Sequence, residues 1–262
     1  MHAFLSRAVL QFLSAYLIMC GPVAAAKELT VETVTMVQDS GFPPYMMQTP
    51  SGPGGVYAEI IYEVDRRLPG YQIELEALPW SRALHLVASG RINTLLGTYY
   101  RPKERPWLSL YSDVITYESV FVYCRKGVAD NSWVFPDDFT GLVFGNNSGF
   151  ETPGPAFFDL VGEGKIFLNE EQTTELNLKL LHYGRADCYV QDKSVVDPIL
   201  SKHVYDMIEP VKQLTYEAAH VGFSEAWDKQ TADKFKRELD RVLQEMKLDG
   251  SIDRIIFQNL VN

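Results

Sequence analysis

Residues 71–97 read YQIELEALPWSRALHLVASGRINTLLG and contain the pattern of one β-α-β unit. Apolar and polar side chains alternate from Tyr71 to Ala77, as in a half-buried strand. Apolar residues at helical spacing follow from Trp80 to Ala88 and stop at Gly90, and the apolar segment 94–96 predicts a second strand. This stretch therefore predicts helices packed on a mainly parallel sheet, which is an α/β fold.

The same alternation of strands and helices continues on both sides. Upstream, a strand over 29–37 precedes a loop at Gly41-Phe42-Pro43-Pro44, because consecutive prolines cannot continue a hydrogen-bonded ladder. A helix, a Gly-Arg pair and a strand recur at Gly90-Arg91 and Gly184-Arg185, which favours two similar lobes. The other predicted elements are strands at 119–124, 142–144 and 188–190, an extended segment at 165–168, and helices near 60–68, 157–161, 176–183, 232–246 and 252–260.

The composition argues against several classes of function. The chain has 262 residues and a formal net charge of −10, which disfavours a nucleic acid or an anionic membrane as partner. It has no glycine-rich phosphate loop, and its histidines and cysteines do not have metal-ligand spacing. Its acidic residues do not form a recognisable acid–base couple. We therefore expect no cofactor, no bound metal and no catalytic residue.

The N-terminal residues 1–26 have the three parts of a secretory signal peptide. Arg7 is the basic residue of the first part, residues 8–20 form a mostly apolar run, and Ala24 to Ala26 supply small side chains for cleavage after Ala26. The alternatives are a membrane-anchoring helix, for which the run is short, and a lipid anchor on Cys20. Removal of this segment predicts a periplasmic protein.

Two cysteines remain after this cleavage, Cys124 and Cys188, and each lies in a predicted strand. An oxidising compartment permits a disulfide between them. The alternative is two buried thiols on separate strands. The sequence leaves both readings open, because a bridge requires a Cα separation that no sequence pattern fixes.

Short motifs along the chain occur in a characteristic order. They are Asp39-Ser40-Gly41-Phe42-Pro43-Pro44-Tyr45, Gly54-Gly55-Val56, Pro79-Trp80, Gly90-Arg91-Ile92-Asn93, residues 97–105, Leu110-Tyr111-Ser112-Asp113, Asn147-Ser148-Gly149, Gly184-Arg185-Ala186-Asp187 and Leu248-Asp249-Gly250-Ser251. In this order the chain resembles the extracellular solute-binding proteins of family 3, the amino-acid receptors of ABC transporters. The resemblance implies an α/β, two-lobed periplasmic-binding-protein-like (type II) fold with two hinge crossover strands. It places lobe 1 at 27–117 plus 222–262 and lobe 2 at 118–221.

The resemblance also implies roles for three charged residues around an interlobe cleft. Arg105 matches the arginine that binds a ligand carboxylate; the alternative is a surface arginine paired with Glu104. Asp192 matches the carboxylate that accepts from the ligand ammonium; the alternative is a helix cap. Asp39 matches a first-lobe position that touches the ligand; the alternative is a turn aspartate bonded to its own backbone.

The rest of the implied site is backbone and aromatic. The second-lobe loop is expected to meet the ligand carboxylate through N–H groups, and Phe42 and Tyr100 are the preferred aromatic walls. Tyr100 and Pro102 depart from the small hydroxyl residue and the threonine usual in the amino-acid receptors, which favours a larger or different ligand. The further implied site residues are Tyr45, Trp80, Gly97, Thr98, Asn147, Ser148, Gly149 and Phe150.

These features together predict a monomeric, non-catalytic receptor. It would close by a hinge on a small polar ligand, an amino acid or a related carboxylate, and deliver it to the permease of an ABC transporter. The alternatives are a dehydratase-like enzyme on the same scaffold and a ligand-sensing module. For the enzyme, Asp39 and Asp192 are the candidate acid–base groups.

Overall fold

The computed structural model describes residues 31–202 and 205–261. The predicted signal peptide, residues 1–26, lies outside these residues, so cleavage after Ala26 stays a prediction. No helix in the two described ranges is long and apolar enough to cross a membrane.

A sheet of nine strands forms the framework of the described chain. The strands are β1 (Glu32–Asp39), β5 (Tyr71–Leu78), β6 (Thr94–Thr98), β7 (Leu108–Tyr111), β8 (Thr116–Arg125), β9 (Val143–Asn147), β10 (Phe167–Glu171), β11 (Cys188–Asp192) and β12 (Ile208–Ser224). Their hydrogen-bonded order is β10-β9-β11-β8-β12-β6-β1-β5, with β7 paired to β12. β1 is parallel to β5 and β6, and β9 is parallel to β10 and β11, so each half of the sheet has the parallel core that the sequence predicts.

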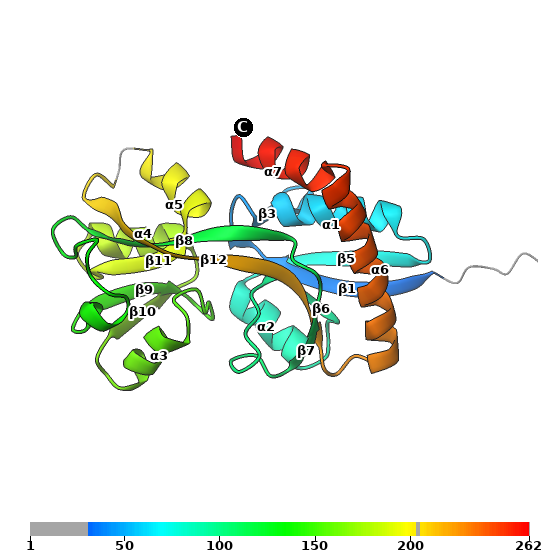
Figure 1. The fold of residues 1–262 in the computed structure, drawn as a ribbon, viewed down its shortest axis with the longest axis horizontal. Helices are drawn as coiled ribbons and strands as arrows, with labels where there is room; N and C mark the ends of the chain where they lie inside the picture. The colour runs from blue at the N-terminus through cyan, green and yellow to red at the C-terminus, as the bar shows by residue number, and fades with distance from the viewer. Residues whose placement is uncertain (1–30, 203–204, 262) are drawn as a thin grey trace, which may run out of the picture. The chain divides into compact units, whose positions relative to one another are not determined.

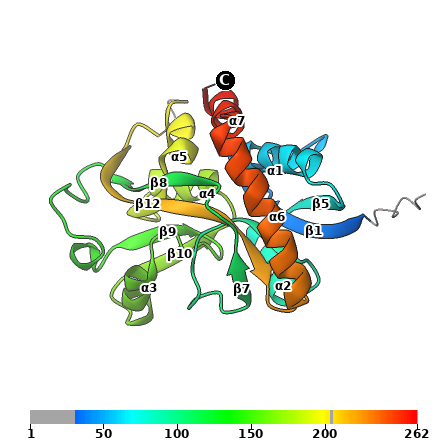
Figure 2. The same cartoon turned by 45° about the vertical axis from the view of Figure 1, so that its right-hand side comes forward.

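Helices pack on this sheet around separate apolar cores (Figures 1 and 2). They are α1 (Val56–Arg67), α2 (Trp80–Ala88), α3 (Pro155–Gly162), α4 (Thr174–His182), α5 (Lys193–Leu200), α6 (Lys229–Leu248) and α7 (Ser251–Val261). One core lies among β1, β6, α1, α2 and α6. Two further clusters lie on opposite faces of β8 and β11, one beneath α3 and the other beneath α4 and α5. The chain therefore forms two lobes.

One long strand connects the two halves of the sheet. β12 has 17 residues; it pairs antiparallel with β8 from Ile208 to Ala219, and with β6 and β7 from His220 onward. Its register shifts between His220 and Val221, where the strand changes partners. β8 and β12 are therefore the strands that run between the lobes, and the path of β12 is visible in Figure 1.

The segment around Gly41-Phe42-Pro43-Pro44 is more regular than predicted. It belongs to a three-stranded sheet of β2 (Gly41–Phe42), β3 (Met46–Thr49) and β4 (Gly52–Gly54). The prediction of a loop across Gly41 and Phe42 is wrong, because Pro43 and Pro44 lie in the turn between β2 and β3. Their missing N–H groups therefore interrupt no pair of the ladder.

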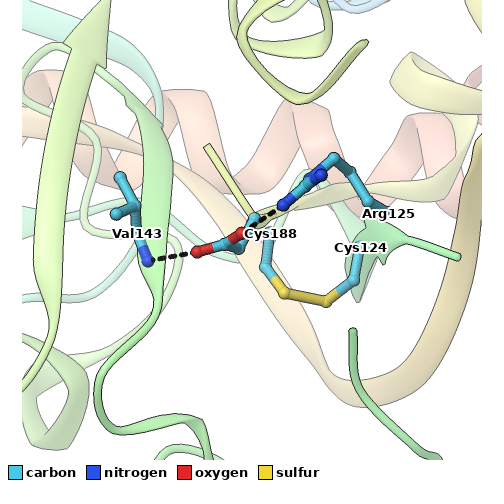
Figure 3. Close-up of a disulfide and its surroundings, with 5 residues drawn as sticks. Cys124, Arg125, Val143 and Cys188 are labelled. Atoms are coloured by element: carbon cyan, nitrogen blue, oxygen red, sulfur yellow. Dashed lines mark hydrogen bonds and ion pairs between the residues drawn. A yellow bond between two sulfur atoms is a disulfide. The ribbon is translucent and has the colours of Figure 1, made fainter. Parts of the chain in front are cut away.

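Cys124 and Cys188 form a disulfide (Figure 3). They lie directly opposite each other in the antiparallel ladder of β8 and β11, with Cα atoms 4.0 Å apart. Beside them Arg125 forms an ion pair with Asp187, and Asp187 also accepts a hydrogen bond from the backbone N–H of Val143. Of the two readings that the sequence left open, the structure contains the bridge.

Candidate functional site

A small cavity brings together residues from both lobes. Its volume is about 20 Å³, which is room for about one water molecule. An amino acid is much larger than this, so the lobes have to separate before such a ligand can occupy the space. The residues that line the cavity are Phe42, Met46, Trp80, Gly97, Tyr99, Arg105, Glu118, Phe150, Glu151 and Thr152.

Arg105 is the cation of this cavity and is only 5% exposed. Its guanidinium donates to the Thr98 hydroxyl at 2.6 Å and to the Gly149 carbonyl at 3.1 Å, and it lies over the Trp80 ring. Burial lowers the pKa of Arg105 to about 10, so the group stays charged at neutral pH. The alternative of a surface arginine paired with Glu104 is therefore wrong.

The second-lobe loop presents a carbonyl to Arg105, where N–H groups were expected. Gly149 accepts from Arg105 and from the indole N–H of Trp80, the latter at 3.2 Å. The N–H of Ser148 donates to the Glu171 carbonyl, and that of Phe150 donates to the Asn147 carbonyl. In this arrangement the loop therefore complements a cation, and a ligand carboxylate would have to displace the carbonyl.

Asn147 points away from the cavity into the second lobe. Its Oδ1 atom accepts from Asn177 Nδ2 and from the Tyr189 hydroxyl, each at 2.7 Å. Both bonds are buried and lie within one lobe, so Asn147 holds the loop in place while Phe150 reaches across.

Aromatic rings close the cavity between the lobes. Phe150 packs edge-on against Phe42 at 5.4 Å and against Trp80 at 5.5 Å, and it belongs to the apolar core of the first lobe. Tyr45 stacks behind Phe42 at 5.7 Å and does not line the cavity. The predicted walls Phe42 and Trp80 are thus at the cavity, together with Phe150.

Tyr100 lies outside the cavity, contrary to its predicted place in the cleft. Its side chain is 59% exposed and packs against Tyr111. The preceding Tyr99 lines the cavity in its place. Successive side chains of an extended segment point to opposite sides, so after Gly97 and Thr98 only one of the two tyrosines can face inward.

Asp39 and Asp192 make the hydrogen bonds expected of the alternative, structural roles: Asp39 as a turn aspartate and Asp192 as a helix cap. Asp39 Oδ1 accepts from the Gly41 N–H at 3.0 Å, while its Oδ2 is buried without a hydrogen bond. Asp192 caps α5 through the Ser194 N–H at 2.7 Å and also accepts from the Ser119 N–H at 2.6 Å. Burial raises the pKa of each aspartate to about 6, against the opposing effect of these hydrogen bonds. Neither aspartate lines the cavity.

Glu118 is the buried acid that the sequence analysis did not single out. It lies on β8 and lines the cavity, and its oxygens accept from the Tyr57 and Tyr99 hydroxyls at 2.5 Å each. Burial raises the pKa of Glu118 to about 8, and the charge of Asp192 adds to the rise. The sequence contained a signal for this burial. Glu118 lies two residues before Val120 in the same strand, and alternating side chains of a strand share a face, so Glu118 is expected on the buried face with Val120.

The site can bind a small molecule that carries opposite charges. The cavity is lined by one buried guanidinium, that of Arg105, by the buried carboxyl group of Glu118 and by several aromatic rings. Glu151, at the edge of the cavity, is a second acid whose pKa burial raises and Arg105 lowers. Within the described ranges no group of three or more His, Cys, Asp or Glu residues could hold a metal ion.

Comparison with known proteins agrees with this architecture. The family described as "Bacterial extracellular solute-binding proteins, family 3" matches residues 34–260. The chain is 23% identical over 207 residues to the "Probable amino-acid-binding protein YxeM" of Bacillus subtilis (strain 168), covering 77% of this chain and 74% of that protein.

Two solved structures have the same fold. "An ancestral arginine-binding protein bound to arginine" has a TM-score of 0.72 at 17% identity, with 88% of this chain and 98% of that one covered. The "Putative L-Cystine ABC transporter from Listeria monocytogenes" has a TM-score of 0.72 at 20% identity, with 87% and 96% covered. The predicted two-lobed α/β fold with two crossover strands is thereby confirmed.

Proposed function

The chain belongs to the bacterial extracellular solute-binding proteins of family 3, and from this premise we propose that it is a receptor for a small amino-acid-type ligand bound between the lobes. One observation carries the proposal: Arg105 is a buried cation in a cavity lined by both lobes, and its present partners are a hydroxyl and a carbonyl. Because these acceptors are neutral, the positive charge of the guanidinium is not compensated by them and can still attract a carboxylate. The amino-acid-binding relatives support the ligand class.

Ligand capture begins with a change of partner at Arg105. A carboxylate that enters the open cleft takes the place of the Gly149 carbonyl on the guanidinium and keeps Thr98 as a neighbour. The planar fork of the arginine suits two parallel bonds to a carboxylate. Phe42 and Trp80 then cover the apolar part of the ligand.

Closure occurs by a hinge between lobe 1, residues 27–117 plus 222–262, and lobe 2, residues 118–221. The crossings lie near 117–119 and 219–221, and the register shift at His220 in β12 supports the second of them. The closed form is favoured by contacts that the ligand makes with both lobes at once. The protein is exported after removal of residues 1–26, acts as a monomer and hands the ligand unchanged to an ABC permease.

Replacement of Arg105 by lysine tests this function. The charge is kept and the fork is lost, so affinity for the ligand should fall about tenfold to hundredfold. Thermal shift and calorimetry with L-arginine, L-glutamine and L-cystine measure the effect on the purified protein. NMR spectra over hours should show the bound amino acid chemically unchanged.

Arg101→Lys is the matched control, because Arg101 lies four residues before Arg105 in the same connection between β6 and β7 and forms an ion pair with Glu217. Its affinity should stay within about threefold of the wild type, because lysine keeps the charge at this position and Arg101 does not line the cavity. Equal affinity of the Arg105 variant and the wild type would contradict the clamp, and conversion of the ligand would contradict the receptor.

A further inference from the structure

Glu118 is a buried acid that forms no ion pair with another of the described residues. Both its oxygens accept from tyrosine hydroxyls, those of Tyr57 on α1 and of Tyr99 after β6. None of the ion pairs among the described residues includes Glu118. An ionised carboxylate in such a place is unfavourable unless a positive charge comes to it. The ion pairs among residues 31–202 and 205–261 do not supply that charge.

Glu118 is placed where it can contact a ligand, and Asp192 is not. Glu118 borders the same cavity as Arg105, whereas Asp192 does not. The two oxygens of Asp192 are already bound by the backbone N–H groups of Ser119 and Ser194. These bonds hold the Asp192 carboxylate beside α5 and β8, while Glu118 is the one of the two acids that lines the cavity.

We propose that Glu118 accepts the ammonium group of the ligand whose carboxylate Arg105 binds. This assignment rests on the proposed function and names its ligand class: a small molecule with a primary amine and a carboxylate. It places the amine acceptor on a strand that runs between the lobes, at a position different from the one that the family resemblance implies. Arg105 and Glu118 then select the two ends of one zwitterion.

The groups around Glu118 couple this binding to a proton. Asp192 on β11 and Glu217 on β12 add negative charge, and Tyr57 and Tyr99 supply neutral donors. Because burial raises the pKa of Glu118 to about 8, the carboxyl group holds a proton at neutral pH.

An arriving ammonium group keeps its own three protons, and the carboxyl proton leaves for the solvent. Glu217 is paired with Arg101, and Arg105 lies across the cavity with the ligand carboxylate, so neither of them takes up this proton. Affinity should therefore increase about tenfold per pH unit from pH 6 toward pH 8.

The test compares amino acids with the same molecules lacking the α-amino group. The probes are L-glutamine with glutaramic acid, and L-arginine with 5-guanidinopentanoic acid. In Glu118→Gln, affinity for the amino acid that binds the wild type should fall about tenfold to hundredfold, while affinity for its deaminated partner changes less than about threefold. Calorimetry of the wild type in two buffers of different ionisation enthalpy should show release of close to one proton at pH 7.

Glu217→Gln is the matched control, because Glu217 is also a glutamate, lies directly opposite Glu118 in the β8–β12 ladder and does not line the cavity. Its affinity for the deaminated member of each pair should stay at the wild-type value, and its affinity for the amino acid should change by less than about threefold, because loss of the Glu217 charge lowers the pKa of Glu118 only slightly. Circular dichroism confirms the fold of each variant, and proton release by the wild type decides the matter if Glu118→Gln does not fold. Unchanged amino-acid affinity in Glu118→Gln, or binding without proton release, overturns the assignment and leaves the receptor function standing. A wild-type protein that binds neither the four probes nor L-cystine overturns both.

Discussion

Two acidic regions at the junction of the lobes differ in how their carboxyl groups are held. Asp192 accepts from two backbone N–H groups, which can only donate, and a hydrogen bond from the Tyr45 hydroxyl adds to them. Glu118 is held by the hydroxyls of Tyr57 and Tyr99, which can donate or accept as the proton comes and goes. Burial raises the pKa of both acids. The difference teaches that equal burial can serve two purposes: rigid structure at Asp192 and exchangeable charge at Glu118.

Removal of Asp192 should have the largest effect on stability. Asp192→Ala removes the cap of α5 and leaves the partly buried Ser119 N–H without its carboxylate partner, so the free energy of unfolding should fall by about 3 kcal/mol. Urea denaturation measures the change. Asp228→Ala is the control, because Asp228 caps α6 in an exposed place, and its replacement should lower the free energy of unfolding by clearly less. Equal losses would show that the second bond of Asp192 contributes nothing.

Glu118 should instead make stability depend on pH. An acid with a raised pKa binds its proton more tightly in the folded chain than in the unfolded one. Its contribution is therefore complete below the ordinary pKa and is lost as pH rises through the folded pKa, which is about 8 here. Between pH 7 and pH 9 this acid should account for a loss of about 1 kcal/mol.

The loss should disappear in Glu118→Gln, measured as urea unfolding in the same two buffers. Asp39 and Asp192, whose pKa values are raised to about 6, lose their contributions at lower pH and do not interfere in this range. If the variant keeps the full pH dependence, the proton resides elsewhere.

The smallest effect is expected at the tyrosine hydroxyls. Tyr57→Phe removes a bond that lowers the pKa of Glu118, so the pH at which stability is lost should move upward by about half a unit to one unit. The same unfolding titration measures the shift. Tyr62→Phe, whose hydroxyl donates to the Pro53 carbonyl at the surface, should leave the profile in place. A downward shift would mean that Tyr57 does not stabilise the ionised acid.

The sequence predicted the elements with a clear period and missed those without one. The alternation over 71–77 and the apolar spacing of α6 correspond to β5 and α6. α5 was not predicted because Pro198 lies inside it, and β12 was not predicted because its first half is partly exposed on both faces. Hydrophobic periodicity arises where one face of an element is buried, so a strand that is partly exposed on both faces shows little of it.

The candidate site was predicted for some residues and not for others. Arg105, Phe42, Trp80 and Phe150 line the cavity, as their motifs predicted. Glu118 was overlooked because an acid inside a run of strand formers reads as a solvent-facing residue. Its burial depends on tyrosines far away in the chain, which local sequence does not reveal.

The disulfide between Cys124 and Cys188 has a consequence at a distance. β8 and β11 are antiparallel, so Asp192 and Glu118 lie toward the ends of these strands that are opposite the bridge. A slip of one residue between paired strands turns every side chain to the other face. The disulfide fixes the register of β8 and β11 and so prevents this slip. In an oxidising compartment a covalent bond therefore keeps the two acids aligned. In a reducing compartment their alignment depends on hydrogen bonds and packing alone.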